Sequence, residues 1–198
     1  MYAKYKDFVD KHIDMTLEEW EHYKTKMSVV HYKKGQTIHH AGNVCNKISF
    51  INAGLVRTYI LGEDGKDYTW NIMFNDENSE VNNLFVVDYY SFVTQKKSMV
   101  NIEVIEECEL LVLEYDDVQS LHETLQKEER LSRLITEIAY ATLYEKMIDR
   151  QMKTSQERFD TFMETTPYLL DKVPQYHIAT YLGMTPQYLS QLKNEYKY

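Results

Sequence analysis

The decisive stretch of this chain reads Gln175-Tyr-His-Ile-Ala-Thr-Tyr-Leu-Gly-Met-Thr-Pro-Gln-Tyr-Leu-Ser-Gln-Leu-Lys193. Its spacing is that of a helix-turn-helix, in which a short turn sets two helices at a steep angle. Ala179 is small where the helices must touch, and Gly183 can supply the positive φ expected at the turn. Thr185 can cap the second helix, whose first position suits Pro186. In such a motif the second helix typically enters the DNA major groove.

The apolar residues of this stretch recur where both helices must face one small core. They are Ile178, Leu182, Met184, Leu189 and Leu192. An ordinary pair of packed helices that reads no DNA is the alternative interpretation.

The composition is that of an ordinary globular protein. The 198 residues are 43% hydrophobic and 27% charged, enough for a core without disulfides. Cys45 and Cys108 have neither the spacing of a disulfide framework nor that of a metal site, and we expect both to pack as small hydrophobes. We see no signal peptide and no apolar run of about 20 residues, so we predict a cytoplasmic protein without membrane contact.

The charge is unevenly distributed along the chain. The formal net charge is −9, which on its own argues against binding to nucleic acid. However, the acidic excess lies before Lys146, and the segment from Lys146 onward is nearly neutral. We therefore expect modest non-specific affinity for DNA.

The middle of the chain has the pattern of an all-β unit. Short alternating apolar runs predict strands over residues 29–32, 48–51, 55–61, 68–74, 100–105 and 110–113. Turn residues separate the runs: Asn52-Ala-Gly54 is expected to be a turn, and Asp64-Gly65 is a strong hairpin signal. Many short strands at this spacing indicate a jelly roll or small barrel.

Helical patterns flank this unit on both sides. Capping-box spacing at Thr16 and again at Thr154 predicts two helix starts. Between them, residues 118–152 contain no Pro or Gly and predict one long helix. Its apolar seam is Leu131, Leu134, Ile138, Ala141 and Ile148, and Glu145 interrupts it. A small roll cannot cover so long a stripe, so we expect a second copy of the helix across a two-fold axis; a helix packed only on its own roll is the alternative.

This order of elements gives an α+β fold in three parts. We predict a β-roll domain with an N-terminal helix over 1–115, a long dimerisation helix over 116–153 and a helix-turn-helix domain over 154–198. Three stretches carry a resemblance: Lys33-Lys-Gly-Gln-Thr-Ile-His-His-Ala-Gly42, Phe50-Ile-Asn-Ala-Gly-Leu-Val-Arg57 with Asp64-Gly65, and residues 173–190. With them the chain resembles the cyclic-AMP receptor protein / fumarate-nitrate regulator (Crp/Fnr) family along nearly its whole length. The resemblance implies a homodimeric transcription regulator whose partners are double-stranded DNA and RNA polymerase.

The region expected to bind an effector departs from the family pattern. Members that bind cyclic nucleotides use a Gly-Glu-Leu turn and an Arg that holds the phosphate. Here residues 75–99 contain neither Gly nor Arg, and Ser98 stands about where that Arg is expected. An anion site without its guanidinium and glycine turn loses its main attractions, so we predict no tight binding of cyclic AMP. We predict no cofactor either: two cysteines cannot hold the four-cysteine cluster of the oxygen-sensing members, and no sequence feature favours a haem, although the histidines leave that alternative open.

Aromatic residues in the same region suggest a different ligand. We expect an effector pocket for an unidentified aromatic or fatty molecule, lined by Tyr68, Trp70, Tyr89, Tyr90 and Phe92, with Ser98. Such residues are also common in cores. The alternative is a roll that senses nothing and serves only as a dimerisation platform.

The second helix of the helix-turn-helix should carry the DNA contacts. The candidates for base contacts are Thr185, Gln187, Tyr188, Ser190 and Gln191, with Lys193, Asn194 and Lys197 nearer phosphates. Lys172 and His177 are further candidates for phosphates. The family pattern has arginines where this chain has Pro186 and Gln191, so bidentate Arg–guanine contacts are missing. Because Gln can pair with adenine, we expect A·T-leaning half-sites and, with few cations, a shallow salt dependence.

No enzyme motif appears in the sequence. There is neither a nucleophile elbow nor a phosphate-binding loop. Cupin enzymes share the small β-roll and bind metals through histidines, but His39 and His40 are neighbours in an expected strand. Their side chains would point to opposite faces and could not chelate one ion. We therefore predict neither a metal site nor an enzymatic activity.

Overall fold

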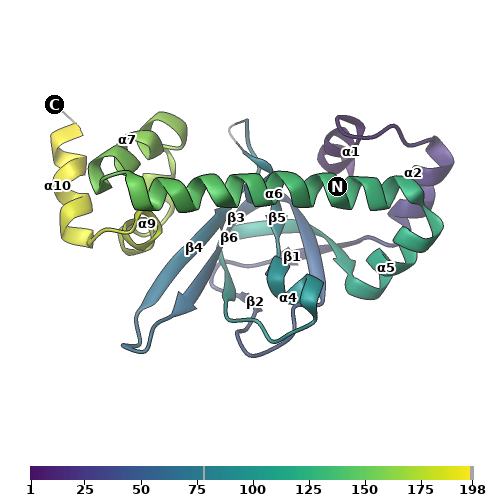
Figure 1. The fold of residues 1–198 in the computed structure, drawn as a ribbon, viewed down its shortest axis with the longest axis horizontal. Helices are drawn as coiled ribbons and strands as arrows, with labels where there is room; N and C mark the ends of the chain where they lie inside the picture. The colour runs from purple at the N-terminus through teal and green to yellow at the C-terminus, as the bar shows by residue number, and fades with distance from the viewer. Residues whose placement is uncertain (78, 197–198) are drawn as a thin grey trace.

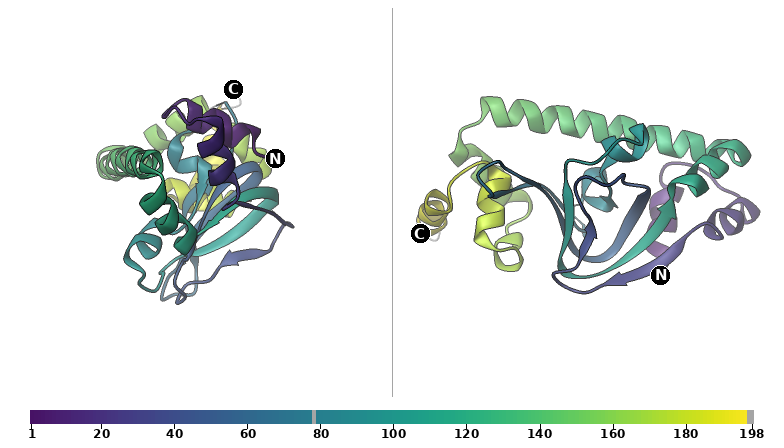
Figure 2. Two further views of the ribbon diagram at one scale, coloured as in Figure 1. Left: turned by 90° about the vertical axis from the view of Figure 1, so that its right-hand side faces the viewer. Right: turned by 90° about the horizontal axis from the view of Figure 1, so that it is seen from below.

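One long helix spans the molecule and connects its parts in this computed structural model, which describes residues 1–77 and 79–196 (Figure 1). This helix, α6 (Gln126–Met152), runs along one side of a β-roll. Two short helices, α1 (Ala3–Asp10) and α2 (Leu17–Lys24), lie near its beginning. The C-terminal helices lie near its end, and the two views of Figure 2 show the same arrangement.

The roll is built from one antiparallel sheet, with strand order β1-β6-β3-β4 and with β2 on β6 and β5 on β3. Its strands in the described residues are β1 (Ser28–Tyr32), β2 (Thr37–His39), β3 (Lys47–Leu61), β4 (Asp67–Met73), β5 (Phe85–Val86) and β6 (Asn101–Glu114). Buried apolar side chains from β3, β4, β5 and β6 fill one core cluster; among them are Ile51, Val56, Met73, Val86, Ile102 and Leu110. The interior of the roll is therefore a packed core.

The turn expected at Asn52-Ala-Gly54 is a bulge inside one continuous strand. The pairing of β3 with β6 shifts register around Ala53, and Gly54 has a φ of +96°. A Cβ at Gly54 would lie 2.3 Å from the carbonyl oxygen of Glu107, so only glycine fits this close approach. The runs 100–105 and 110–113 likewise join in one strand, β6. The glycine and polar residues therefore indicated an irregularity at the right place. The structure accommodates it as a shift of register within one strand and not as a turn between two strands.

The expected single helix over 118–152 is two helices. α5 (Tyr115–Thr124) ends before Leu125, whose extended backbone (φ −136°, ψ 91°) separates it from α6. The Leu125 side chain is buried in the core that α1, α2 and the outer face of the sheet share. The buried Leu125 thus separates two helices that run in different directions. No Pro or Gly in the sequence indicates this break.

Two short helices lie between β4 and β6, namely α3 (Val81–Leu84) and α4 (Tyr89–Thr94). The C-terminal part contains α7 (Ser155–Thr165), α8 (Leu169–Lys172), α9 (Gln175–Leu182) and α10 (Pro186–Tyr196). Both predicted capping boxes, at Thr16 and Thr154, are present. The core of the C-terminal helices continues into the roll through Leu55 and Ile72, so this part is docked on the roll.

Candidate DNA-reading corner and roll–helix cavity

The two helices α9 and α10 meet at the corner that the sequence predicts. Gly183 ends α9 in the left-handed conformation, with a φ of +68°. The Met184 amide donates to the Ala179 carbonyl at 2.9 Å, and Ala179 is completely buried. The Thr185 hydroxyl accepts from the Tyr188 amide at 3.2 Å and so caps α10. Small size, positive φ and an oxygen cap thus fix the angle between the two helices.

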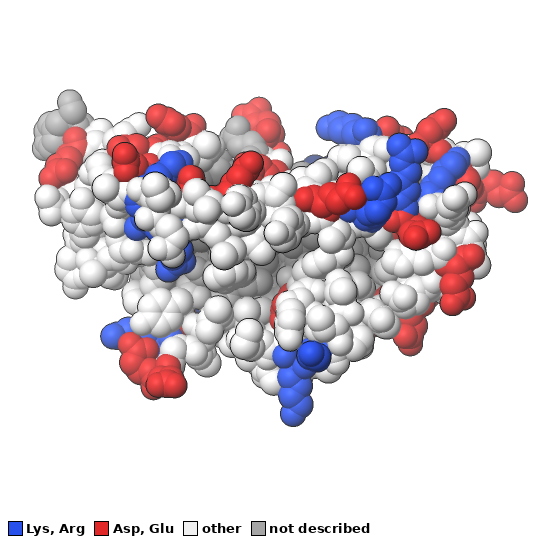
Figure 3. Space-filling view, in the orientation of Figure 1, with Lys and Arg blue, Asp and Glu red and all other residues white. Residues whose placement is uncertain are grey.

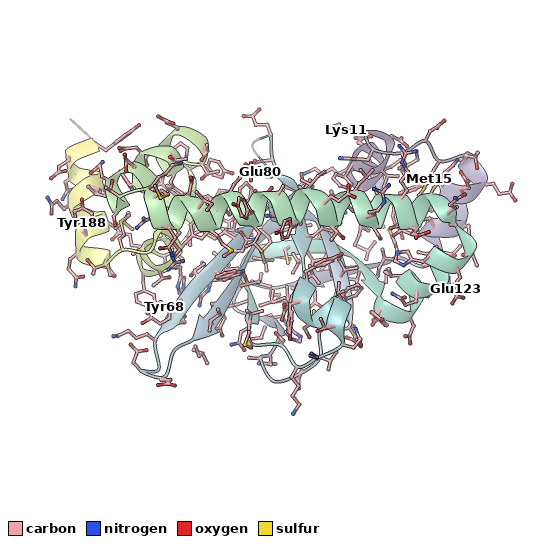
Figure 4. All side chains as sticks on the ribbon, viewed as in Figure 1. Lys11, Met15, Tyr68, Glu80, Glu123 and Tyr188 are labelled. Atoms are coloured by element: carbon pink, nitrogen blue, oxygen red, sulfur yellow. The ribbon has the colours of Figure 1, made fainter. Side chains whose placement is uncertain are left out.

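The polar residues of α10 form its solvent face, while Leu189 and Leu192 are buried. The exposed positions among the expected DNA contacts are Thr185, Gln187, Tyr188, Ser190, Gln191 and Asn194, and Lys193 is half-buried. Figure 4 shows Tyr188 at the outer end of the molecule. The Gln191 amide donates to Glu195 at 2.8 Å, a bond it must release to reach a base. Lys197 lies outside the described residues.

Two of the expected phosphate contacts lie close to acidic side chains of the roll. Lys172 lies 3.4 Å from Glu106 in an ion pair. His177 Nδ1 lies 3.7 Å from Asp67, and burial, with a smaller effect from nearby Arg57, lowers the pKa of this histidine. His177 packs against the roll because α9 carries both the helix-turn-helix and the docking contact, whereas Lys172, on α8, stays exposed.

The docking contact joins α9 to strand β4. The Thr180 hydroxyl accepts from the Thr69 amide at 3.1 Å, and the Tyr176 hydroxyl donates to the Asp67 carbonyl at 3.0 Å. Beneath them Arg57 bridges the carboxylates of Asp67, at 2.7 Å, and Glu103, at 2.8 Å. The buried arginine of the roll is therefore committed to a structural network and is not directed at a ligand.

The residues expected to line an effector pocket do not converge. Tyr68 and Trp70 are exposed on β4, and Figure 4 shows Tyr68 near the tip of the β3–β4 hairpin, well away from α4. Tyr90 is exposed on α4. Ser98 is buried, but its hydroxyl already bonds to the backbone of Val100. It donates to the Val100 carbonyl and accepts from the Val100 amide, each at 3.0 Å. Tyr89 and Phe92 are the members of the set that line a cavity between the roll and α6.

That cavity lies outside the roll, between the sheet, α4, α5 and the first turns of α6. Its volume is about 400 Å³. The apolar lining includes Tyr5, Tyr23, Phe50, Phe85, Phe92 and Leu113. These residues come from α1, α2, the sheet and α4, segments that are far apart in the sequence, which is why no local motif reveals the cavity.

A buried carboxylate, Glu128, lies in the cavity wall. It is only 3% exposed, and its Oε1 accepts from the Ser132 hydroxyl at 3.0 Å. The His122 Nε2 atom lies 3.0 Å from the same hydroxyl. Burial raises the pKa of Glu128 to about 7, although the Ser132 and Tyr23 hydroxyls limit the rise. Its second oxygen, Oε2, completes no hydrogen bond within the described part of the chain. Sequence reasoning missed this residue, which resembles an ordinary surface acid.

Hydrogen bonds tie the roll to α6 beside the cavity. The Tyr89 hydroxyl bonds to the Thr136 hydroxyl, and Asn82 donates to the Ala139 carbonyl at 3.5 Å. In the segment expected to bind an effector, the buried Asn83 side chain is satisfied internally: it donates to the Ile72 carbonyl and accepts from the Glu80 amide.

The exposed apolar surface of α6 includes Ile148, the last residue of the predicted seam, and lies mostly beyond the other seam residues. Leu131 is completely buried in its own protomer, Leu134 packs on the same core, Ile138 is half-buried, and Ala141 is exposed but small. The large exposed apolar residues are Tyr140, Leu143, Tyr144, Met147, Ile148 and Met152. We call these six the α6 stripe. In Figure 3 the middle of α6 is mainly uncharged surface.

Other features of the described residues point to no further chemistry. Both cysteines are buried and free, and burial raises the pKa of each thiol. In the described ranges, no three His, Cys, Asp or Glu side chains gather as a metal site requires. No helix in those ranges has the length and apolarity that crossing a bilayer demands.

A β-roll, a long helix and a C-terminal helix-turn-helix, in this order, define the fold of the Crp/Fnr transcriptional regulators. Residues 29–124 match the family model of the cyclic nucleotide-binding domain. No curated protein matches the sequence.

Solved structures extend the likeness to nearly the whole chain. FixK2 from Bradyrhizobium japonicum shares 16% identity and a TM-score of 0.70, over 86% of this chain and 84% of that one. A Crp/Fnr-family transcriptional regulator from Eubacterium rectale has 16% identity and a TM-score of 0.67, over 93% and 84%. A CooA mutant from Carboxydothermus hydrogenoformans has 18% identity and a TM-score of 0.63, over 93% and 85%. At these identities the likeness shows the fold.

Proposed function

We propose that this protein is a DNA-binding transcription regulator that acts as a homodimer and reads DNA with α10. The observation that carries the proposal is the corner at Gly183, which exposes the polar face of α10 and buries Leu189 and Leu192. Gln187 and Gln191 stand four residues apart and so share one helix face. A purely structural helix pair would not need an exposed face so poor in charge and so rich in amide groups.

The α6 stripe supports the homodimer. Six large apolar side chains exposed along one half of a helix form a surface that a second copy can cover. A two-fold axis along the stripe would place the two α10 helices on one side of the dimer. The pair would then read the two halves of a palindromic site. RNA polymerase remains a predicted partner.

The proposed base contacts predict the kind of site. Glutamine pairs with adenine in the major groove, and α10 has no arginine for guanine. In its described part α10 has one basic residue, Lys193, and one acidic residue, Glu195. We therefore propose A·T-leaning half-sites and a shallow salt dependence.

The proposal excludes cyclic AMP as the effector. The buried arginine of the roll is held by Asp67 and Glu103, and Ser98 and Asn83 are satisfied internally. Calorimetry with cyclic AMP and cyclic GMP tests this point. Micromolar binding of either nucleotide would contradict it.

Selection from random DNA, followed by footprinting, tests the main proposal. We expect a palindromic site with A·T-leaning half-sites, and a Gln187→Ala/Gln191→Ala variant should relax base preference with a loss of about 1–3 kcal/mol per contact. Lys34→Ala on the exposed roll surface is the control and should bind normally. Failure to enrich any sequence would refute DNA reading. The slope of log binding constant against log salt concentration counts the phosphate contacts. A slope of about −10 for the dimer would contradict the proposal that these contacts are few.

A further inference from the structure

We propose that the cavity between α4, α5 and α6 binds a small aromatic amine, with the ring among its aromatic side chains and the ammonium group on Glu128. The site lies outside the roll interior, which Ile51, Val56 and Leu110 fill. Its volume of about 400 Å³ falls in the range of small-molecule sites. A single ring with a short aliphatic amine fits this space.

The Glu128 carboxylate determines how a ligand is oriented in the cavity. Glu128 is almost completely buried, its Oε1 is held by Ser132, and its Oε2 completes no hydrogen bond with the described residues. The Tyr23 hydroxyl, which already bonds to Tyr5, is the donor near this carboxylate besides Ser132, and a buried carboxylate so weakly satisfied is costly unless a further donor meets it. An ammonium group supplies both the donor and the opposite charge.

Aromatic side chains strengthen the preference for a cation. Tyr5, Tyr23 and Phe50 line the cavity on the side of Glu128 and the sheet, and ring faces attract ammonium groups. The same rings can pack against an aromatic ligand in tilted or stacked geometry. The lining thus suits a ligand that is both cationic and aromatic.

The other charged residues of the lining disfavour an anion. Glu129 adds a second acid to Glu128, while Arg133, the lining arginine, is paired with Glu137 at 2.8 Å. His122 is directed at Ser132 rather than at the cavity centre, with 3.0 Å between Nε2 and Oγ. A carboxylate ligand would meet uncompensated negative charge, and a neutral ligand would leave Oε2 without a strong partner.

The ionisation of Glu128 agrees with this assignment. Burial raises the pKa of the carboxyl to about 7, so the empty site exists partly in its neutral form near pH 7. A bound ammonium group stabilises the carboxylate, and binding should release a proton from the protein. The heat of binding should therefore depend on the ionisation enthalpy of the buffer.

The site is placed to influence α6. The lining residue Tyr89 on α4 bonds to Thr136 on α6, and Glu128 and Ser132 belong to the same helix. A ligand that fills the cavity would fix α6 against the roll, and α6 continues into the stripe proposed for dimerisation. This regulatory consequence rests on the proposed function; the binding site itself does not.

Calorimetry with 2-phenylethylamine, 2-phenylethanol and 3-phenylpropionate tests the site on the full chain without DNA. We expect the amine to bind, the alcohol to bind at least about 10-fold more weakly, and the carboxylate not to bind. Glu128→Gln should weaken amine binding by about 10-fold or more. Glu123→Gln, an exposed change on α5, is the matched control and should bind like the original protein.

A second variant keeps the test independent of folding defects at Glu128. Val93→Trp narrows the cavity from a wall residue whose side chain is more than half exposed, and it leaves Glu128 intact. Amine binding should weaken in this variant while circular dichroism stays unchanged. Equal binding of amine and carboxylate, amine binding unaffected by Glu128→Gln, or no binding of the amine at millimolar concentration would each overturn the proposal.

These outcomes separate the site from the proposed function. Amine binding by a protein that selects no DNA sequence would refute the regulator and retain the site. Sequence-specific DNA binding without amine binding would refute the site and retain the regulator.

Discussion

The two halves of α6 have opposite environments although they belong to one continuous helix. In the first half, Leu131 is fully buried and Glu128 lies in the cavity wall. In the second half, the side chains of Tyr140 and Met152 are 69% and 78% exposed. Both halves have apolar residues at helical spacing, so composition does not distinguish them. Their position relative to the roll does.

This difference teaches how a helix longer than its platform is stabilised. At about 1.5 Å per residue, the 27 residues of α6 extend about 40 Å, beyond the face that the roll and the N-terminal helices can cover. The first half gains its stability from its own protomer. The second half leaves apolar surface for a partner, and each prediction below acts on one half while sparing the other.

The largest effect is expected from a cavity in the first half. Leu131→Ala removes a fully buried side chain and should lower the free energy of unfolding by about 2–5 kcal/mol. Leu143→Ala, in the exposed stripe, is the matched control and should cost less than about 1 kcal/mol in the monomer. Urea denaturation at several protein concentrations separates folding from association. Equal losses for both variants would show that the two halves are not different.

Charges in the second half should break the dimer without unfolding the protomer. Tyr144→Glu/Met147→Glu places two like charges in the stripe, which should raise the dimer dissociation constant about 100-fold, or ~3 kcal/mol. Sedimentation analysis measures the change, and circular dichroism checks the fold. Arg130→Glu, an exposed change in the first half, should leave association intact. Unchanged sedimentation of the double variant would exclude the stripe as the interface.

The sequence predicted what local chemistry determines. The corner at Gly183 and the caps at Thr16 and Thr154 depend on residues within one or two turns, and the structure contains all three. It could not predict which half of α6 is covered. The seam through Leu131 and Ala141 has the same period as the stripe, and only the tertiary position of the roll separates them.

The cavity was beyond reach for a related reason. Tyr5 and Tyr23 are separated from Phe92 by most of the β-roll in sequence, and nothing local brings the three together. Glu128 sits next to Glu129 in a charged run, Gln126-Lys-Glu-Glu-Arg130, that reads as a solvated helix start.

The buried carboxylate of the first half should make stability depend on pH. Burial raises the pKa of Glu128 from 4.5 to about 7, against the lowering effect of the Ser132 and Tyr23 hydroxyls. A raised folded-state pKa means that this stability is complete below pH 4.5 and is lost as pH rises through about 7. Between pH 5 and pH 7 we expect a loss of about 2 kcal/mol that is absent in Glu128→Gln. Parallel pH profiles of the two proteins would show that this carboxyl is not the cause.

The smallest effect concerns the bond that ties the first half to the roll. Tyr89→Phe removes the hydroxyl that bonds to Thr136 and keeps the ring in the cavity wall. Because Thr136 still donates to the Ser132 carbonyl, no buried donor is left unpaired, and the loss should be only about 1 kcal/mol. Tyr90→Phe, an exposed neighbour on α4, should change stability by less than about 0.5 kcal/mol.

Hydrogen exchange gives the sharper test of Tyr89→Phe. Protection of the backbone amides should fall in residues 130–138 of α6 and stay constant in residues 144–152, since the second half has no bond to the roll through this tyrosine. Uniform loss of protection along α6 would mean that the helix responds as one unit, and the contrast between its halves would then be a matter of exposure alone.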